Sequence, residues 1–311
     1  MNKLIEHLHF QITRNCNLRC EFCGQWGKKG FFKDAMGTDM TFSDWEKIIS
    51  EIVNTCNPLP KITVWGGEPL VSPVFDELMP TLKDIGFYTE VITNGVLLDK
   101  YMDIVKTCVD KLYVSIDGTR KVHDAVRGRG VYDKVGENLC KLSHNNVTVM
   151  SVITDKLIKV LPEFLKELES LGISELLLQD MIGLSSSEVS EYKAWLFNDF
   201  GICAHDIDSW ENNQIEDFSK AIENFDFSGL GYRVIHKKHG TDGVCKSPFL
   251  HPHIAWNGNV HYCTDFYDFW AGNVKNETLF EIFNNGKSEK FRQAVLNNKC
   301  PACNACSWRN T

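Results

Sequence analysis

The chain has 311 residues, of which 43% are hydrophobic and 24% charged, as in an ordinary globular protein with a full core. Its formal net charge of −8 argues against a nucleic-acid partner bound through phosphate contacts. No apolar run approaches the roughly 18 residues of a transmembrane helix. The first ten residues, MNKLIEHLHF, lack the apolar segment of a signal peptide, so we expect a cytoplasmic protein without a membrane partner.

Short apolar runs alternate with amphipathic ones over the first 180 residues. The pattern predicts strands at His7–Thr13, Lys61–Trp65, Tyr88–Thr93, Lys111–Ser115, Val147–Thr154 and Glu175–Asp180. It predicts helices at Ser43–Asn54, Phe75–Ile85, Tyr101–Cys108, Tyr132–His144 and Leu157–Leu171. Ser43 and Glu46 have the spacing of a capping box for the first helix. Six such units predict a parallel sheet with helices outside, either a partial barrel or an open sheet, with function at the carboxyl ends of the strands.

The pattern changes after about residue 182. Residues 183–243 are more polar, with one predicted acidic helix at Glu216–Phe225, and we interpret them as a bridging segment. From residue 244 to 311 the predicted strands are short, at His253–Trp256 and Val260–Tyr262. A module of this size has little core of its own and needs a cross-link, such as a bound metal, to be stable. We therefore expect three regions, 1–182, 183–243 and 244–311.

Eight of the twelve cysteines gather near the two ends of the chain. In a reducing compartment such groups indicate metal or redox chemistry, because disulfides are rare there. Cys16, Cys20 and Cys23 follow the first predicted strand in one loop, and three thiolates suit iron or zinc. A [4Fe–4S] cluster held by three cysteines leaves one iron open, whereas a zinc site would need His7 or His9 as fourth ligand.

Four short motifs each follow a predicted strand. In chain order they are Cys16-x-x-x-Cys20-x-Phe22-Cys23, Gly66-Gly67-Glu68-Pro69, Thr93-Asn94-Gly95 and Ser115-Ile116-Asp117-Gly118, the last followed by His123-Asp124-x-x-Arg127. Each motif alone is weak, but their order resembles that of the radical S-adenosylmethionine (SAM) enzymes. The resemblance implies an α/β fold, a partial (β/α)6 TIM-type barrel with a small C-terminal iron–sulfur module.

The resemblance also implies which residues bind the cofactors. Cys16, Cys20 and Cys23 would hold the SAM-binding [4Fe–4S] cluster, whose open iron binds the amino and carboxylate groups of SAM. Glycines let the backbone approach a ligand closely. The SAM contacts implied are therefore Gly66, Gly67 and Glu68 for the amino group, Arg127 for the carboxylate, Ser115 for the ribose or methionine end, and Phe22 for the adenine. Asn94 and Asp117 are further candidates, with turn formation as the alternative.

The C-terminal cysteines are spaced as Cys245-x12-Gly258-x4-Cys263 and Cys300-x2-Cys303-x2-Cys306. This spacing resembles the SPASM and twitch extensions of radical SAM enzymes, which hold auxiliary iron–sulfur clusters. Five thiols are too few for two four-cysteine clusters, so we expect one auxiliary [4Fe–4S] cluster. Cys245 and Cys263 are its expected ligands, with two of the remaining three. A structural zinc ribbon is the alternative.

The implied enzyme cleaves SAM to a 5′-deoxyadenosyl radical, which abstracts hydrogen from a substrate C–H bond. A flavodoxin- or ferredoxin-type protein would donate the electron. Residues 115–136 resemble the peptide-modifying group most, so we expect a peptide or protein side chain as substrate, the auxiliary cluster as electron acceptor and Asp265 as a candidate base. The alternatives are a twitch-type dehydrogenase of a small-molecule sugar or aminocyclitol and a non-catalytic zinc-binding barrel scaffold.

Overall fold

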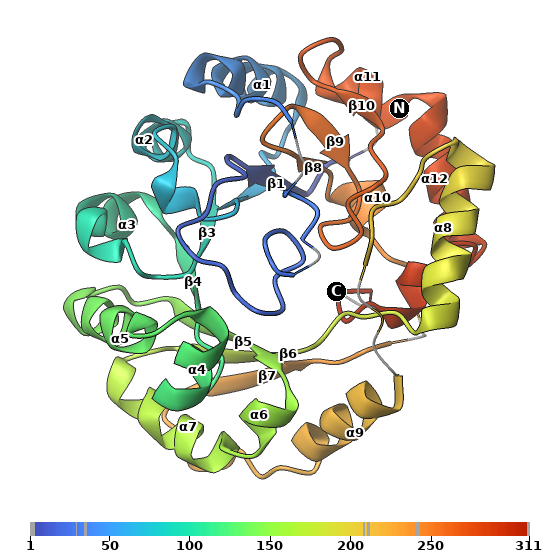
Figure 1. Cartoon of the computed structure of the whole chain (residues 1–311). Helices are drawn as coiled ribbons and strands as arrows, with labels where there is room; N and C mark the ends of the chain where they lie inside the picture. The colour runs from blue at the N-terminus through green and yellow to red at the C-terminus, as the bar shows by residue number, and fades with distance from the viewer. Residues whose placement is uncertain are drawn as a thin grey trace.

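The computed structural model describes residues 4–309 except 29, 34–35, 208, 210–211 and 241–242. Its strands form one sheet in the order β10-β9-β8-β1-β2-β3-β4-β5-β6-β7, which curls into a ring with helices around the outside (Figure 1). The strands are β1 His7–Gln11, β2 Lys61–Trp65, β3 Thr89–Thr93, β4 Lys111–Ser115, β5 Val147–Ile153, β6 Glu175–Asp180, β7 Arg233–Lys237, β8 His253–Ile254, β9 Asn259–His261 and β10 Gly272–Asn273.

The helices follow the strands in alternation through most of the chain. They are α1 Phe42–Thr55, α2 Phe75–Ile85, α3 Met102–Cys108, α4 Arg120–Arg127, α5 Val131–Lys141, α6 Asp155–Ile158, α7 Leu161–Leu168, α8 Ser186–Phe200, α9 Asn212–Glu223, α10 Ser247–Leu250, α11 Leu279–Asn284 and α12 Gly286–Leu296. None of the described helices is long and apolar enough to cross a bilayer.

The two faces of β1 show how the sequence places the core. Successive side chains of a strand point to opposite faces. Phe10 is fully buried, and its ring lies 4.7 Å from that of Trp45 in α1, outside the ring of strands. His7, His9 and Gln11 therefore face the interior of the barrel.

Ion pairs line the interior where strands β2 to β7 begin. Lys61 pairs with Glu90 at 3.0 Å, and Lys111 with Glu175 at 3.1 Å. Arg233 of β7 donates from Nε to the same Glu175 at 2.9 Å. These contacts join strands at their amino ends, and the Lys111–Glu175 pair reaches from β4 past β5 to β6. They leave the carboxyl ends for the site.

The expected α/β fold, a partial barrel with a small C-terminal module, is confirmed. Four elements keep their predicted bounds, namely β2, α2, β4 and β6. The predicted helix over Leu157–Leu171 is divided into α6 and α7, and Pro162 lies in the first turn of α7. The capping box of α1 was predicted at the wrong pair of residues. Thr41 accepts a hydrogen bond from the backbone of Asp44, whose side chain accepts one from Thr41.

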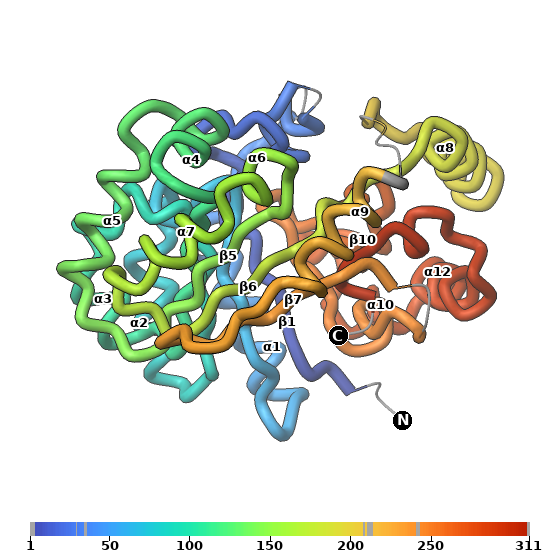
Figure 2. The backbone as a smooth tube through the Cα atoms, turned by 90° about the horizontal axis from the view of Figure 1, so that it is seen from below, coloured from blue at the N-terminus to red at the C-terminus, as the bar shows by residue number. Residues whose placement is uncertain are grey.

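The segment expected to bridge two domains also contributes to the sheet. It contains α8, α9 and β7, and β7 pairs in parallel with β6. The C-terminal module joins the other edge, because β8 pairs in parallel with β1 through His9–His253 and Phe10–Ile254. Figure 2 shows α8 projecting away from the barrel, above α12 of the module. The division at residues 182 and 243 stays a prediction.

Candidate functional site

The loop after β1 carries three cysteines across the mouth of the barrel (Figure 1). The amide of Leu18 donates to Cys16 Sγ at 3.4 Å. Burial raises the pKa of Cys16 to about 11 and also raises the pKa of Cys20. These thiols stay protonated near neutral pH unless a metal displaces the proton, which iron ligation does. Thiols with raised pKa values, together with an amide that donates to one of them, fit the ligands of an iron–sulfur cluster.

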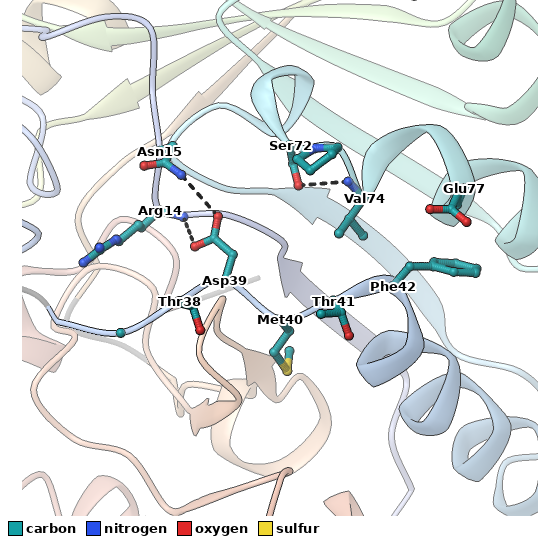
Figure 3. Close-up of a pocket in the computed structure, with 12 residues that line it drawn as sticks. Arg14, Asn15, Thr38, Asp39, Met40, Thr41, Phe42, Ser72, Val74 and Glu77 are labelled. Carbon is teal, nitrogen blue, oxygen red and sulfur yellow. Dashed lines mark hydrogen bonds between the residues drawn. The ribbon is translucent and has the colours of Figure 1, made fainter.

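Asp39 fixes the segment that leads into this loop, on the wall of a pocket of about 600 Å³ (Figure 3). Its carboxylate accepts hydrogen bonds from Thr13 Oγ1, from Arg14 N at 3.4 Å and from Asn15 Nδ2 at 3.3 Å. Asp39 could not be predicted from the sequence, because it belongs to no motif and meets residues 24 to 26 positions away only in the fold.

Gly66 and Gly67 lie against the backbone of the same segment. A Cβ on Gly66 would lie 2.6 Å from the carbonyl oxygen of Thr13, and one on Gly67 would lie 2.4 Å from those of Arg14 and Asn15. No side chain fits at such distances. We expected the glycines to permit close approach of a ligand. The structure shows that they permit close approach of the cysteine loop, and their contact with SAM stays a prediction.

Glu68 is 1% exposed and joins the ends of β2 and β3. Its Oε1 accepts hydrogen bonds from Thr93 Oγ1 at 2.6 Å and from the amide of Leu70 at 3.2 Å. Its Oε2 accepts from the amide of Asn94 at 2.7 Å. Burial raises the pKa of Glu68 to about 7, against the effect of these donors. Protein groups thus satisfy both oxygens, and the contact with the SAM ammonium stays a prediction.

Asn94 links the end of β3 to the cysteine loop. Its Nδ2 donates to Asn17 Oδ1 at 2.8 Å and lies 4.0 Å from Cys16 Sγ. Its Oδ1 accepts from the amide of Val96, so the turn that was the alternative is also present. The side chain therefore lies where its amide can orient the thiol of Cys16.

Asp117 and Arg127 form an ion pair beside the second cysteine of the loop. The distance from Arg127 Nε to Asp117 Oδ2 is 2.6 Å, and Arg127 Nη1 lies 3.8 Å from Cys20 Sγ. The other oxygen of Asp117 accepts from the amide of Val152 at 3.1 Å. Helix α4, which the sequence analysis missed, ends at Arg127 and so sets its position.

Three other residues near this site are His123, Phe22 and Ser115. His123 Nδ1 accepts from the amide of Asp117 at 3.1 Å, and burial lowers the pKa of His123 to about 4. The neutral imidazole thus supports the loop after β4. Phe22 lies in the cysteine loop and Ser115 at the end of β4, and both are half-buried. Their contacts with SAM stay predictions.

The five C-terminal cysteines line one cavity together with aromatic side chains. Its wall includes Cys245, Cys263, Cys300, Cys303, Cys306, Tyr192, Trp195, Phe266, Phe269 and Arg309. The amide of Phe266 donates to Cys263 Sγ at 3.3 Å, and that of Trp308 to Cys306 Sγ at 3.4 Å. Burial raises the pKa of Cys245 to about 11. Clustered buried thiols with amide donors fit an iron–sulfur cluster here as well.

Asp265 lies beside two of these cysteines. Its side chain keeps access to solvent, yet the surrounding protein raises its pKa by desolvation. Its charge acts on Cys263 and Cys306, and Thr264 Oγ1 donates to its Oδ2 at 3.1 Å. A carboxyl group in such a place can take up a proton.

Stacked aromatic rings join the segment after the first cysteine loop to the segment after Cys263. Phe31 of the first loop stacks on Tyr267 at 4.9 Å, and Tyr267 stacks on His261 of β9 at 3.9 Å. Tyr267 also donates to Gln11 Oε1 of β1 at 2.9 Å. This connection was not predicted from the sequence, because it joins residues more than 200 positions apart.

The structure gives no support to a zinc site with His7 or His9. Both lie on β1 before its carboxyl end, and His7 Nε2 hydrogen-bonds to Thr63 Oγ1 at 2.7 Å. The cysteines follow the opposite end of the strand. Within the described ranges, no three His, Cys, Asp or Glu side chains surround a single metal position.

Comparison with known families agrees with this arrangement. Residues 10–173 match the radical SAM superfamily, and residues 245–307 match SPASM, an iron–sulfur cluster-binding domain. The first match covers more than half of the chain. The chain therefore belongs to the radical SAM superfamily and carries a C-terminal SPASM domain. It is an enzyme that uses SAM and a [4Fe–4S] cluster, and its SPASM domain binds auxiliary iron–sulfur.

Individual relatives are more distant. The tungsten-containing aldehyde ferredoxin oxidoreductase cofactor-modifying protein of Pyrococcus furiosus is 27% identical, over 98% of this chain and 88% of the relative. The serine-type anaerobic sulfatase-maturating enzyme of Bacteroides thetaiotaomicron is 24% identical, over 94% and 78%.

Two solved structures share the fold. Streptococcus suis SuiB bound to S-adenosylmethionine has a TM-score of 0.69 at 13% identity, over 98% of this chain and 72% of that one. The native enzyme anSMEcpe with bound AdoMet has a TM-score of 0.64 at 17% identity, over 93% and 83%.

Proposed function

We propose that this radical SAM enzyme oxidises a peptide or protein side chain, with one auxiliary cluster as electron acceptor. The observation that carries the proposal is the single cavity lined by all five C-terminal cysteines. The relative from Bacteroides thetaiotaomicron supports the substrate class, since a sulfatase-maturating enzyme by its name acts on a protein. A small flavodoxin or ferredoxin would supply the electron for SAM cleavage.

The residues of the first site would bind and orient SAM. When bound, SAM and its cluster supply a 5′-deoxyadenosyl radical, which takes a hydrogen atom from the substrate. Cys16, Cys20 and Cys23 would ligate the cluster. Arg127 would present its remaining guanidinium face to the SAM carboxylate while Asp117 holds it in place. The contacts with Asp39 and the glycines keep the loop rigid.

The second site would accept the electron and the proton that the substrate loses next. After the hydrogen atom has left, an oxidative reaction requires the substrate to give up one electron and one proton. Asp265 would accept the proton, because its raised pKa makes it a better base than a carboxylate with the ordinary pKa. Cys245 and Cys263, with two of Cys300, Cys303 and Cys306, would hold the cluster that accepts the electron.

A second candidate is modification of a cofactor instead of a protein. The 27% identity to the Pyrococcus furiosus protein, named for modifying a cofactor, extends over 98% of this chain. The two candidates differ in the size of the molecule that loses a hydrogen atom.

The test uses an extract of cells grown in deuterated medium, divided into macromolecules and small molecules. Each fraction is incubated anaerobically with the reconstituted enzyme, unlabelled SAM and dithionite, and 5′-deoxyadenosine is analysed by mass spectrometry. We expect deuterium transfer from the macromolecular fraction and its loss after protease treatment. Transfer from the small-molecule fraction alone would overturn the peptide proposal in favour of a cofactor.

A further inference from the structure

Arg309 is a buried cation on the wall of the C-terminal cavity. Its side chain is 4% exposed. Nη1 lies 3.5 Å from the carbonyl oxygen of Cys303, and the guanidinium charge acts on the thiols of Cys303 and Cys245. The proposed function gives this arginine no role.

The hydrogen-bond partners of Arg309 are neutral. Nε donates to the carbonyl oxygen of Gly243 at 2.9 Å, Nη1 to Asn304 Oδ1 at 2.8 Å and Nη2 to Asn298 Oδ1 at 2.5 Å. Among the residues that the structure describes, no carboxylate forms an ion pair with it. A buried charge held only by neutral groups is costly, unless an anion lies close by. A cluster bound by four thiolates is such an anion.

The first site has a partly buried arginine of a different kind. Arg127 also approaches a cysteine, at 3.8 Å from Cys20 Sγ, but Asp117 neutralises it at 2.6 Å. The two cysteine sites thus receive different electrostatic fields from similar side chains. The field at the C-terminal site favours additional negative charge.

We propose that Arg309 raises the reduction potential of the auxiliary cluster and so makes it an electron acceptor. Reduction adds one electron to the cluster, and a fixed cation nearby stabilises the reduced form more than the oxidised form. The inference rests on the proposed function, since it requires a cluster in this cavity.

One other charged group beside these cysteines acts in the opposite sense. Asp265, when ionised, disfavours reduction, and its charge reaches Cys263 and Cys306. Arg309 reaches Cys245 and Cys303 instead. The two groups therefore act on different cysteines, and a substitution of Arg309 tests its contribution alone.

The experiment isolates the auxiliary cluster by replacing Cys16, Cys20 and Cys23 with Ala. In this background, Arg309→Gln removes the charge, and Arg309→Lys keeps it with fewer hydrogen bonds. Each protein is reconstituted anaerobically, its iron is counted, and its potential is measured by a redox titration followed by electron paramagnetic resonance. We expect Arg309→Gln to lower the ratio of reduced to oxidised cluster at a given potential by about tenfold, or about 59 mV for one electron. Arg309→Lys should stay near the parent.

A second pair of variants keeps Arg309 itself. Asn304 is exposed and its Oδ1 contacts Nη1 of Arg309, so Asn304→Asp provides a counter-ion without changing shape. It should lower the potential as Arg309→Gln does. Asn276→Asp adds the same charge at an exposed position of the module and serves as the matched control.

The outcomes separate the two proposals. Full iron with unchanged potentials in Arg309→Gln and Asn304→Asp would overturn the role of Arg309 and leave the cluster in place. Equal potential shifts in Arg309→Lys and Arg309→Gln would indicate a structural effect and also overturn it. Absence of iron from the parent background would overturn the auxiliary cluster itself.

Discussion

Glu68 shows how a single residue can belong to a recognised motif and still serve an unexpected purpose. It lies in the glycine motif, where the family resemblance assigns it to SAM. In the fold its two oxygens join β2, β3 and the turn between them. Burial shifts its pKa upward to about 7 in spite of these donors, and this shift makes stability depend on pH.

The first prediction concerns this dependence. A carboxyl group whose folded pKa exceeds its unfolded value of 4.5 stabilises the fold below pH 4.5, and the stabilisation is lost as pH rises to about 7. The free energy of unfolding should fall across this window by up to about 3 kcal/mol. Urea unfolding at several pH values measures it. The fall should be smaller in Glu68→Gln, and an equal fall in that variant would show that other groups cause it.

The second prediction concerns Gly67. A methyl group there would lie 2.4 Å from two carbonyl oxygens of the cysteine loop. Gly67→Ala should therefore displace the loop and reduce iron bound by the first site to a small fraction of wild type. Gly136→Ala is the matched control, because its Cβ meets one side chain at 3.9 Å in a helix. The iron content is measured in a variant that lacks the C-terminal cysteines. A normal iron content in Gly67→Ala would contradict the prediction.

The candidate site residues could be recognised from sequence only where their chemistry is local. The three cysteines of the first loop fall within eight consecutive positions, and Gly66, Gly67 and Glu68 are adjacent. Asp39 and Tyr267 have no such signature. Each acts through partners that only the fold brings near, such as Thr13 for Asp39 and Gln11 for Tyr267.

At the scale of elements, capping decides where helices begin. Thr41 and Asp44 cap α1, and Ser185 and Glu188 cap α8 in the same way. The first box was predicted two residues late, because Ser43 and Glu46 fit the more common Glu pattern. Helix α8 was not predicted, although Ser185 and Glu188 have this spacing, because only two residues of that helix are buried.

The third prediction separates the two capping boxes. Thr41→Ala removes the side chain that accepts the Asp44 amide hydrogen and should cost about 1 kcal/mol of stability. Ser43→Ala should change stability by less than about 0.5 kcal/mol, as for an ordinary substitution within a helix. Urea unfolding of both variants measures the difference. An equal loss in the two variants would contradict the observed cap.

The strands were predictable to the extent that they are apolar. β2, β4 and β6 keep their predicted bounds, because each is a short segment between turns that is either continuously apolar or alternately buried. β7 was missed because its residues, Arg233–Lys237, are mostly charged or half-buried at the edge of the parallel sheet. An edge strand does not need the apolar pattern of a central one.

At the scale of the whole molecule, alternation of strands and helices was enough to predict the barrel class. The position of the C-terminal module was not predictable. It depends on pairing between β1 and β8, which lie more than 240 residues apart in sequence. The pairing brings the C-terminal module, which carries five of the cysteines, against the first strand of the barrel.

The fourth prediction tests that arrangement. Cys263→Ala should leave the first cluster in place, so 5′-deoxyadenosine should still form, while little product should appear. The ratio of product to 5′-deoxyadenosine, measured with iron counted, distinguishes the possibilities. A ratio equal to wild type would contradict the electron-acceptor role. Joint loss of both compounds would indicate that the module only supports the fold.

The pairing of β8 with β1 also bears on how the chain is made. During synthesis β1 emerges long before β8, so the backbone groups on this edge of β1 stay unpaired. The amides of Glu6 and His9 find their acceptors, the carbonyls of Leu250 and Pro252, only after more than 240 further residues have been made. An unpaired strand edge is a site of association with other chains. Ribosome-bound intermediates of this enzyme should therefore depend on a chaperone until the last module emerges and closes that edge.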